Sequence, residues 1–510
     1  MHSSARRDSK RDVMGGIELP LQLQHELDEL KDIFRVDTAK LKQIVDRFEE
    51  ELYLGLARIS RCLLPSLEDG GGSLPMNVTY IQDWPTGKEH GDFLTLDLGS
   101  TAVLRVCHVT LSENKEQTKV DRISYEIPAE FKVGSVEPLI AFLVDSIEDF
   151  LSKRRLPAAL PLGFTFSFPV TQEEIDHGVL QTWTKGFDVK GAEGHDVADL
   201  LRREINERGL PVKLVALLND TTGAMMASRY RDPQTVIGAI FGTGCNAAYM
   251  EHCADIPKIS GMPSGQLMAI NCEYGAFDNE HLVLPRTKYD IELDEDSPRP
   301  GEQAFEKMSA GESPELSLMQ LMQSGLYLGE LFRRVMLDLI ERDVLFHGQD
   351  TTALLRPYIF NTVWLSAIEN DTSPQMQNSL KAFQTISITP SEHELAMLRH
   401  LAQAIAIRGA RLCCCGVAAI CKKKGITSGH VAADGSVANK HSHFKKRWAE
   451  ALGEVLDWPA NRTEDPIIIT AAEDGTGIGA AVISAMAPQW PRQKERRASR
   501  QRPSIGGAEV

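Results

Sequence analysis

Four short apolar runs of the sequence each end in small or polar residues that could bind a ligand. These runs and their endings span residues 93–101, 215–221, 236–244 and 467–477. In the first and third, the endings begin at Gly99 and Gly242, and small residues let backbone N–H groups approach phosphate oxygens closely. The second ends in Asn219 and Asp220, although a carboxylate at such a place is most often a helix cap. Two of the four patterns therefore predict a pair of turns that could close on a phosphate chain.

The apolar runs are typical of strands, and the segments between them carry helical patterns. Apolar residues recur at helical spacing from Leu41 to Leu52, with charged residues on the opposite face. The glycine- and proline-rich segment 65–91 predicts a boundary between structural units. Strands that are separated by helices predict an α/β fold in which ligand groups lie at strand ends.

The composition excludes several classes of protein. Of the 510 residues, 42% are hydrophobic and 25% are charged, which predicts about two to four folded units and rules out wholesale disorder. The net charge of −16 disfavours nucleic-acid binding. No apolar run predicts a membrane span, and segment 1–16 lacks the apolar core of a secretory signal. We therefore expect a cytoplasmic or nuclear protein whose nine cysteines are reduced.

Several motifs occur in an order that is far more specific than any one of them alone. They are the segments 162–169, 183–187, 219–221, 242–247, 271–277, 300–308, 327–331 and 474–481. In this order the motifs resemble the hexokinase family over roughly residues 40 to 487. The resemblance implies an α/β fold with two lobes of the actin-like, ribonuclease-H-like type and a ligand cleft between them.

The resemblance also implies how the chain is divided. The large lobe is expected at residues 18–75 and 221–470, and the small lobe at residues 76–220 and 471–489. Residues 1–17 and 490–510 are expected to be disordered termini. Because the second terminus is basic, it predicts either a plain solvated tail or a patch for nuclear import or an acidic partner.

On the family pattern, Asp220 is the general base that takes the proton of a hexose 6-hydroxyl as that oxygen attacks the γ-phosphoryl group of ATP. The residues implied to hold glucose or a related hexose are Ser167, Phe168, Thr184, Lys185, Asn219, Asn246, Glu273, Gln303 and Glu306. Those implied to hold ATP and its phosphates are Asp97, Gly99, Ser100, Thr101, Arg105, Gly242, Thr243, Gly244, Asp474, Gly475, Thr476 and Gly477. The implied cofactor is ATP with Mg²⁺, which no side chain binds directly and which Asp97 reaches through water.

The first phosphate-binding turn departs from the family pattern. Ser100 replaces a glycine, Ala102 replaces an asparagine, and one additional residue separates Thr101 from Arg105. A Cβ at residue 100 could obstruct a phosphate oxygen, and an extra hairpin residue must form a bulge or turn the later side chains to the opposite face. We therefore expect Arg105 to point away from the phosphates and phosphotransfer to be weak.

A second departure lies after Met308, where the family usually has one residue and this chain has residues 309–323. This insertion could alter closure or bind a partner, and a tolerated surface loop is an equally good interpretation. Together the departures resemble the atypical hexokinases of filamentous fungi, which are associated with regulation, including that of secreted proteases. The leading hypothesis is a hexose-binding regulator with impaired or absent phosphotransfer and a regulatory protein partner. The alternatives are an active ATP-dependent hexokinase and a scaffold that binds neither ligand.

Overall fold

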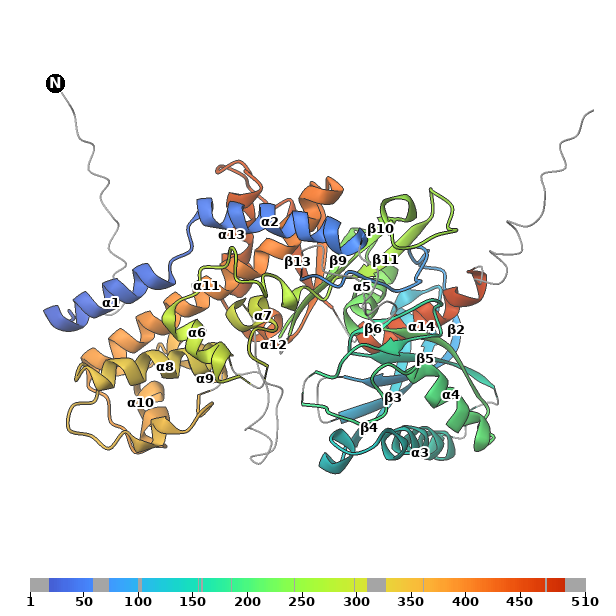
Figure 1. Cartoon of the computed structure of the whole chain (residues 1–510), viewed down its shortest axis with the longest axis horizontal. Coiled ribbons are helices and arrows are strands. Elements are labelled where there is room, and N and C mark those ends of the chain that lie inside the picture. Colours follow the sequence, from blue (N-terminus) through green and yellow to red (C-terminus); the bar gives the residue numbers. More distant parts are fainter. Residues whose placement is uncertain are drawn as a thin grey trace, which may run out of the picture.

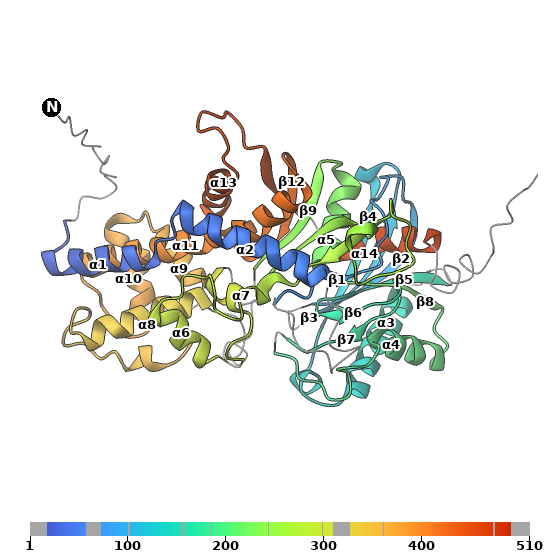
Figure 2. The same cartoon turned by 45° about the horizontal axis from the view of Figure 1, so that its top comes forward.

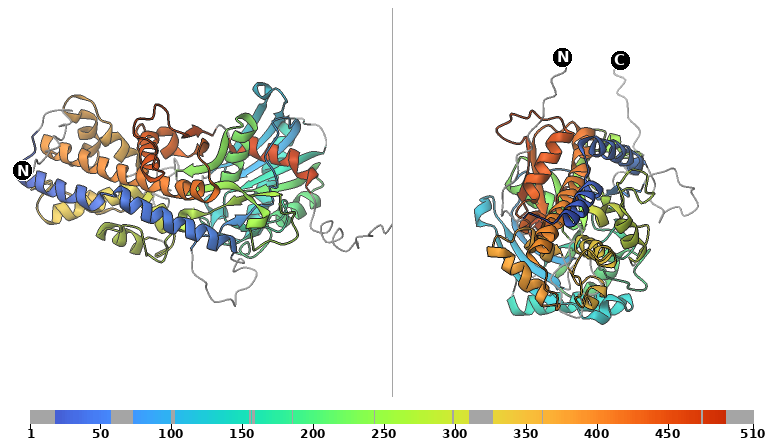
Figure 3. Two further views of the ribbon diagram at one scale, coloured as in Figure 1. Left: turned by 90° about the horizontal axis from the view of Figure 1, so that it is seen from above. Right: turned by 90° about the vertical axis from the view of Figure 1, so that its left-hand side faces the viewer.

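The chain folds into two lobes, each built on one β-sheet, and a helical extension of the lobe with the larger sheet (Figure 1). The computed structural model describes residues 18–57, 73–99, 103–154, 156, 159–184, 186–242, 244–297, 299–309, 327–360, 362–472 and 475–490. The helical extension and the small lobe lie at opposite ends of the molecule, with the six-stranded sheet between them (Figures 2 and 3).

The small lobe contains a five-stranded sheet with the strand order β4-β3-β2-β5-β8. Its strands are β2 (Gly91–Leu98), β3 (Val103–Leu111), β4 (Lys119–Glu126), β5 (Leu160–Phe166) and β8 (Val212–Leu218). Successive residues of a strand face opposite sides, so two apolar layers form. One layer packs against α3 (Val136–Arg154) and α4 (Val197–Glu207), and the other against α14 (Gly475–Met486). The short strands β6 (Val170–Thr171) and β7 (Val179–Leu180) pair separately.

The large lobe contains a six-stranded sheet with the strand order β1-β11-β10-β9-β12-β13. Its strands are β1 (Asn77–Val78), β9 (Thr235–Phe241), β10 (Cys245–His252), β11 (Leu267–Asn271), β12 (Gly429–Asp434) and β13 (Ile467–Ala471). Strand β12 runs parallel to both of its neighbours, whereas the other pairs are antiparallel. On one face lie α2 (Thr38–Ala57), α11 (Glu392–Lys424) and α13 (Phe444–Val455), and α5 (Asp220–Arg231) packs against β9 and β10.

The helical extension has its own apolar core. It is formed by the first half of α11 with α1 (Leu21–Phe34), α6 (Lys288–Glu295), α8 (Tyr327–Glu341), α9 (Thr362–Glu369) and α10 (Gln377–Gln384). Two short helices, α7 (Ala304–Ser309) and α12 (Ser436–Lys440), lie nearer to the sheets.

Local sequence explains the two helices that organise the large lobe. The predicted apolar face of α2 is confirmed, because Leu41, Phe48 and Leu52 are fully buried. Helix α11 begins at a capping box between Ser391 and Glu394 and ends at Gly425, whose φ of +63° suits glycine. Among the described residues, α11 is the one helix long and apolar enough to cross a membrane, but most of that stretch is buried inside the protein.

The expected two-lobed α/β architecture is present. Residues 77–78, which we assigned to the small lobe, pair with β11 of the large-lobe sheet. Trp490, which we assigned to the tail, is buried in the core around α14. The expected disordered termini otherwise lie outside the described residues, as does most of the insertion 309–323.

Candidate active site

Asp220 lies at the junction of the two lobes, as the first residue of α5 directly after β8. The side chain of Asn219 caps the helix by accepting the backbone N–H of Thr221 at 2.8 Å. The carboxylate of Asp220 accepts the same N–H at 2.7 Å and the Thr221 hydroxyl at 3.1 Å, and the residue remains half-buried. The amino end of a helix attracts negative charge, and Asp220 is the acidic residue in the first turn of α5.

Beside Asp220, amide and carboxylate side chains from β10 and the end of β11 form a connected cluster. Asn246 donates from Nδ2 to Asn271 Oδ1 at 2.7 Å and accepts the backbone N–H of Glu273 at 2.8 Å. Asn271 donates to Glu273 Oε1 at 2.7 Å, and Asn219 lies 3.4 Å from the same oxygen. The structure therefore brings together three of the predicted hexose ligands and adds Asn271, which sequence reasoning had passed over although it opens the motif 271–277.

Gln303 and Glu306 approach the cluster from the loop before α7 and from α7 itself. A Cβ at Gly275 would lie 2.4 Å from Gln303 Oε1 and 3.0 Å from Glu306 Oε2, so only glycine fits between them. Glu306 Oε2 also accepts the backbone N–H of Cys245 at 3.3 Å. Glu273 and Gln303 both have left-handed backbone conformations, with φ of +53° and +55°. Such conformations are unfavourable for these residue types and are concentrated at binding sites.

The expected ligands from the small lobe are arranged differently. Ser167 is buried at the end of β5, where its backbone N–H donates to Leu98 O at 3.1 Å. The ring of Phe168 is fully buried against Trp183 and Phe187, so its side chain belongs to the core and does not line a sugar site as we had expected. Thr184 is half-buried, and Lys185 lies outside the described residues.

The first phosphate turn joins β2 to β3. Asp97 and Arg105 are directly opposite each other in a regular antiparallel ladder, which places their side chains on the same face. The Arg105 guanidinium donates to Asp97 Oδ2 at 3.0 Å, and Thr476 at the start of α14 donates to the same oxygen at 3.0 Å. The described ladder of β2 with β3 contains no bulge, and residues 100–102 lie outside the described residues. Arg105 points at Asp97, and the expectation that the ladder would turn it away was wrong.

The remaining glycines of the predicted nucleotide site allow backbones to touch. A Cβ at Gly242 would lie 3.0 Å from the Cα of Gly435, and one at Gly475 would lie 2.9 Å from the Cα of Ala224. Gly244 faces Glu306, because a Cβ there would lie 3.1 Å from Glu306 Oε2. Gly477 is buried within α14, and Thr243 and Asp474 lie outside the described residues.

Asp434 is a further carboxylate at this edge, which sequence reasoning missed. It ends β12, next to β9, and accepts the N–H of Gly435 at 2.7 Å. The signal was present, because Ala432, Ala433, Asp434 and Gly435 repeat the pattern of a strand that ends in a small polar turn. The next residue, Gly435, lies against Gly242, so the end of β12 joins the other strand ends at the site.

Burial and neighbouring charges shift the pKa values of two carboxyl groups in the site. Burial raises the pKa of Asp97, which Arg105 and Thr476 oppose and the charge of Asp220 reinforces. Burial also raises the pKa of Asp434, and Asp220 again adds to the effect. In addition, the buried Oδ1 of Asp97 makes no hydrogen bond to any residue that the structure describes. In the described part of the chain, no group of three or more His, Cys, Asp or Glu side chains could hold a metal ion directly. The free Oδ1 of Asp97 instead fits a water of a hydrated Mg²⁺ that nucleotide phosphates would hold.

Comparison with known proteins identifies this arrangement. Two family models described as hexokinase match residues 26–230 and 236–486. A hexokinase of Emericella nidulans is 49% identical over 92% of this chain and 92% of its own length. Hexokinase-1 of Saccharomyces cerevisiae is 44% identical over 94% of this chain and 95% of its own. The chain belongs to the hexokinase family. A hexokinase from Schistosoma mansoni in complex with glucose is 32% identical, covers 91% of this chain and 99% of its own, and superposes with a TM-score of 0.79.

The described residues on either side of the expected insertion lie close together in this member of the hexokinase family. Ser309 and Leu328 both touch α11 at Gly409, because a Cβ there would lie 2.7 Å from Ser309 O and 3.6 Å from Leu328 Cδ1. These two described residues therefore lie against α11 at nearly one place, and Ser309 is the last residue of the helix that carries Glu306.

Proposed function

We propose that this member of the hexokinase family binds glucose or a related hexose, transfers phosphate poorly or not at all, and acts as a sugar-responsive regulator. The observation that carries the proposal is the contrast between the two halves of the site. On the hexose side, the side chains of Asn246, Asn271 and Glu273 form one hydrogen-bonded cluster. The first phosphate turn has an altered sequence, and its arginine is paired with Asp97.

Two features around Asp97 oppose catalysis. The guanidinium charge of Arg105 is already compensated by Asp97, so it stabilises a transferring phosphoryl group less than a free arginine would. Burial raises the pKa of Asp97, so the ionised form that would hold a hydrated Mg²⁺ is less favoured than in an exposed aspartate. Because phosphoryl transfer depends on position and charge, these two effects support a large loss of rate.

A specific observation also supports a second candidate, an active ATP-dependent hexokinase that phosphorylates the hexose 6-hydroxyl. Asp220 is retained at the helix start, where it can accept the hydroxyl proton, and Asp97 Oδ1 has no hydrogen-bond partner among the described residues. Mg²⁺ would be reached by Asp97 through water, and the metal would neutralise phosphate charge when bound. The curated relatives named above are all hexokinases, as this candidate requires.

An assay of the purified chain separates the two candidates. Formation of glucose 6-phosphate from ATP and glucose is measured beside an Asp220→Ala control, and glucose binding is measured by calorimetry. The regulator predicts sugar-dependent heat with turnover far below the usual range of roughly 1 to 1000 per second. Turnover within that range that Asp220→Ala abolishes would instead establish the enzyme. No heat and no thermal shift at high glucose would leave a scaffold that binds neither ligand.

If turnover is weak, the phosphate turn itself can be tested by restoring the family pattern. We expect the combination Ser100→Gly and Ala102→Asn with deletion of Val103 to raise turnover and leave glucose affinity unchanged. An unchanged rate would show that the defect lies elsewhere in the chain.

A further inference from the structure

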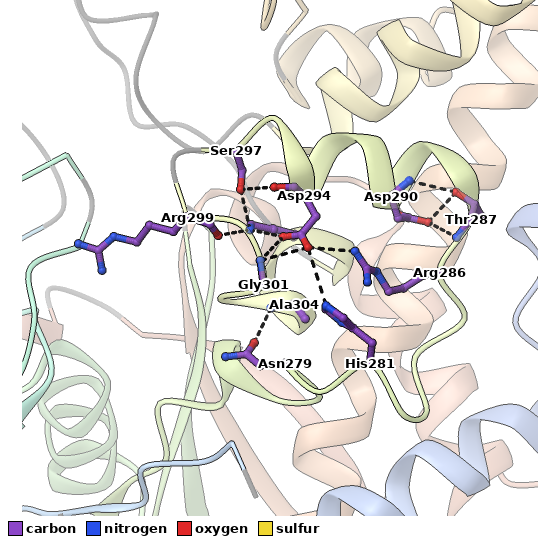
Figure 4. Close-up of polar contacts among 11 residues, drawn as sticks. Asn279, His281, Arg286, Thr287, Asp290, Asp294, Ser297, Arg299, Gly301 and Ala304 are labelled. Carbon is purple, nitrogen blue, oxygen red and sulfur yellow. Dashed lines mark hydrogen bonds and ion pairs between the residues drawn. The ribbon is translucent and has the colours of Figure 1, made fainter. Parts of the chain in front are cut away.

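A buried ion pair joins α7 to α6, and Figure 4 shows its aspartate, Asp294, among the polar groups around it. Lys307 follows Glu306 in α7, and its ammonium donates to Asp294 Oδ1 at 2.6 Å from a side chain that is only 6% exposed. Asp294 belongs to α6 and is 10% exposed. Removing two opposite charges from water contributes little net stability, but a pair that is kept despite this cost fixes the geometry around it.

The pair ties both ends of the loop between α6 and α7 to a single point. Lys307 Nζ also donates to Ser297 Oγ at 2.8 Å and to the backbone oxygen of Arg299 at 2.9 Å. On the other side, the backbone N–H of Gly301 lies 3.2 Å from each oxygen of Asp294. All three N–H groups of the ammonium are therefore used, one by Asp294 in α6 and two by the loop that leads to Gln303.

Three further contacts fix the surroundings of this pair. Arg286 donates to Asp294 Oδ2 at 3.0 Å, and His281 lies 3.9 Å from that oxygen. Asn279 accepts the backbone N–H of Ala304 at 3.0 Å and so closes the first turn of α7. Although burial opposes it, the hydrogen bond and charge of Lys307 hold the pKa of Asp294 below its usual range. Asp294 therefore stays ionised, which keeps the ammonium in place at neutral pH.

The same loop also reaches the other lobe. Arg299, whose backbone oxygen Lys307 holds, donates from Nη1 to the hydroxyl of Thr182 at 3.2 Å. Thr182 precedes the segment 183–187 that carries the expected hexose ligands of the small lobe. The ion pair thus stands between the large-lobe sugar ligands and a contact between the lobes.

We infer that Asp294 and Lys307 are positioning residues for hexose binding, which hold Gln303 and Glu306 in place and set the contact of Arg299 with the small lobe. This inference rests on the hexose binding proposed above. It assigns no direct contact with sugar to either residue. Their effect passes through the loop and through the first turn of α7.

The test compares Lys307→Met with a matched change at another buried lysine. Lys423 is 3% exposed and pairs with Glu251, which is fully buried, in the part of the large lobe where α11 ends. Lys307→Met and Lys423→Met thus remove the same charge from similar surroundings. Glucose affinity is measured by calorimetry, and the unfolding midpoint by circular dichroism. Asp294→Asn, which keeps the shape of the side chain, serves as a second variant if Lys307→Met does not fold.

We expect Lys307→Met to raise the Kd for glucose by about 10- to 100-fold, as small displacements of binding groups do, and Asp294→Asn to act in the same direction. Lys423→Met should lower the midpoint by a similar amount and leave the Kd within about twofold. Combining Lys307→Met with Glu306→Gln should weaken binding less than the product of the two single effects, because both act through Glu306.

The inference is overturned if the loss of affinity follows the loss of stability equally in all variants, or if Lys307→Met and Asp294→Asn leave the Kd unchanged. A wild-type chain that binds no hexose would refute the proposed function, an outcome that the first titration separates from the failure of this inference.

Discussion

Asp97→Asn tests whether burial of the charged Asp97 carboxylate, beside the first phosphate turn, lowers the stability of the folded protein. Burial raises the pKa of Asp97, so the folded protein binds this proton more readily than the unfolded chain does. The free energy of unfolding therefore falls as pH rises from the ordinary pKa of aspartate, about 3.9, through the raised pKa of the folded protein. At still higher pH it remains at the lower value. An asparagine has the same shape and can still accept from Arg105 and Thr476.

The magnitude follows from two opposing effects. The substitution removes the cost of a buried charge at a side chain that is only 4% exposed. It also removes the attraction to Arg105, which solvent screens because that side chain is 34% exposed. We expect a net gain of about 1 kcal/mol in the free energy of unfolding at neutral pH, or roughly 2 to 4 °C in the midpoint of a lobe of this size.

The assay is thermal unfolding of the wild type and Asp97→Asn at several values from about pH 4 to about pH 8, since the gain should shrink toward the acid end. Asp290→Asn is the matched control of opposite sign. Although burial opposes it, the charge and hydrogen bonds of Arg408 hold the pKa of Asp290 low. Breaking that buried pair should lower the free energy of unfolding by about 3 to 5 kcal/mol. A lower midpoint for Asp97→Asn at every pH would refute the reasoning, because it would mean that the ion pair with Arg105 outweighs burial.

Three further predictions concern packing, the hexose cluster and acid stability. A Cβ at Gly479 would lie 2.1 Å from the backbone oxygen of Gly223, so Gly479→Ala should lower the free energy of unfolding by about 2 kcal/mol in urea titrations despite the better helix propensity of alanine. An unchanged midpoint would show that α5 and α14 separate easily. Asn271→Ala should raise the Kd for glucose about tenfold in calorimetry, because Glu273 and Asn246 each lose a hydrogen bond; equal affinity would remove Asn271 from the cluster. Although burial opposes it, hydrogen bonds and charges from Lys423 and Lys424 hold the pKa of Glu251 low. The stability that Glu251 contributes at neutral pH should therefore be lost as pH falls below the ordinary glutamate range. In Glu251→Gln, the unfolding midpoint should fall less steeply with acid than in the wild type.

The parts of the fold that follow local rules could be predicted from the sequence. Strand β8 and its ending at Asn219 and Asp220 were predicted, because an apolar run followed by a cap is a local signal. The helical face of α2 was predicted for the same reason. Asn271 was missed as a site residue because it belongs to a buried strand. In a sequence, an amide there that binds a ligand looks the same as one that only completes hydrogen bonds of the fold.

What depends on distant pairing could not be predicted. Lys307 and Asp294 are thirteen residues apart on different helices, and no spacing rule joins them. Phe168 was expected to hold the sugar beside Ser167, yet its ring packs in the core against Trp183 and Phe187, which follow it by 15 and 19 residues in the chain. Which face of the sheet Arg105 lies on depends on the register of β2 with β3, and the sequence alone does not give that register.

The position of α14 has a consequence for how the chain is made. Gly163 in β5 presses against α14 so closely that a Cβ there would lie 2.7 Å from Ala480 O, and the helix covers one face of the small-lobe sheet. The five strands of that sheet end at Leu218, long before α14 begins at Gly475. During synthesis, these strands therefore leave the ribosome with an apolar face that stays bare until more than half of the protein has followed. A chain that stops short of α14 should be held by chaperones or aggregate, even though every strand of the small lobe is present.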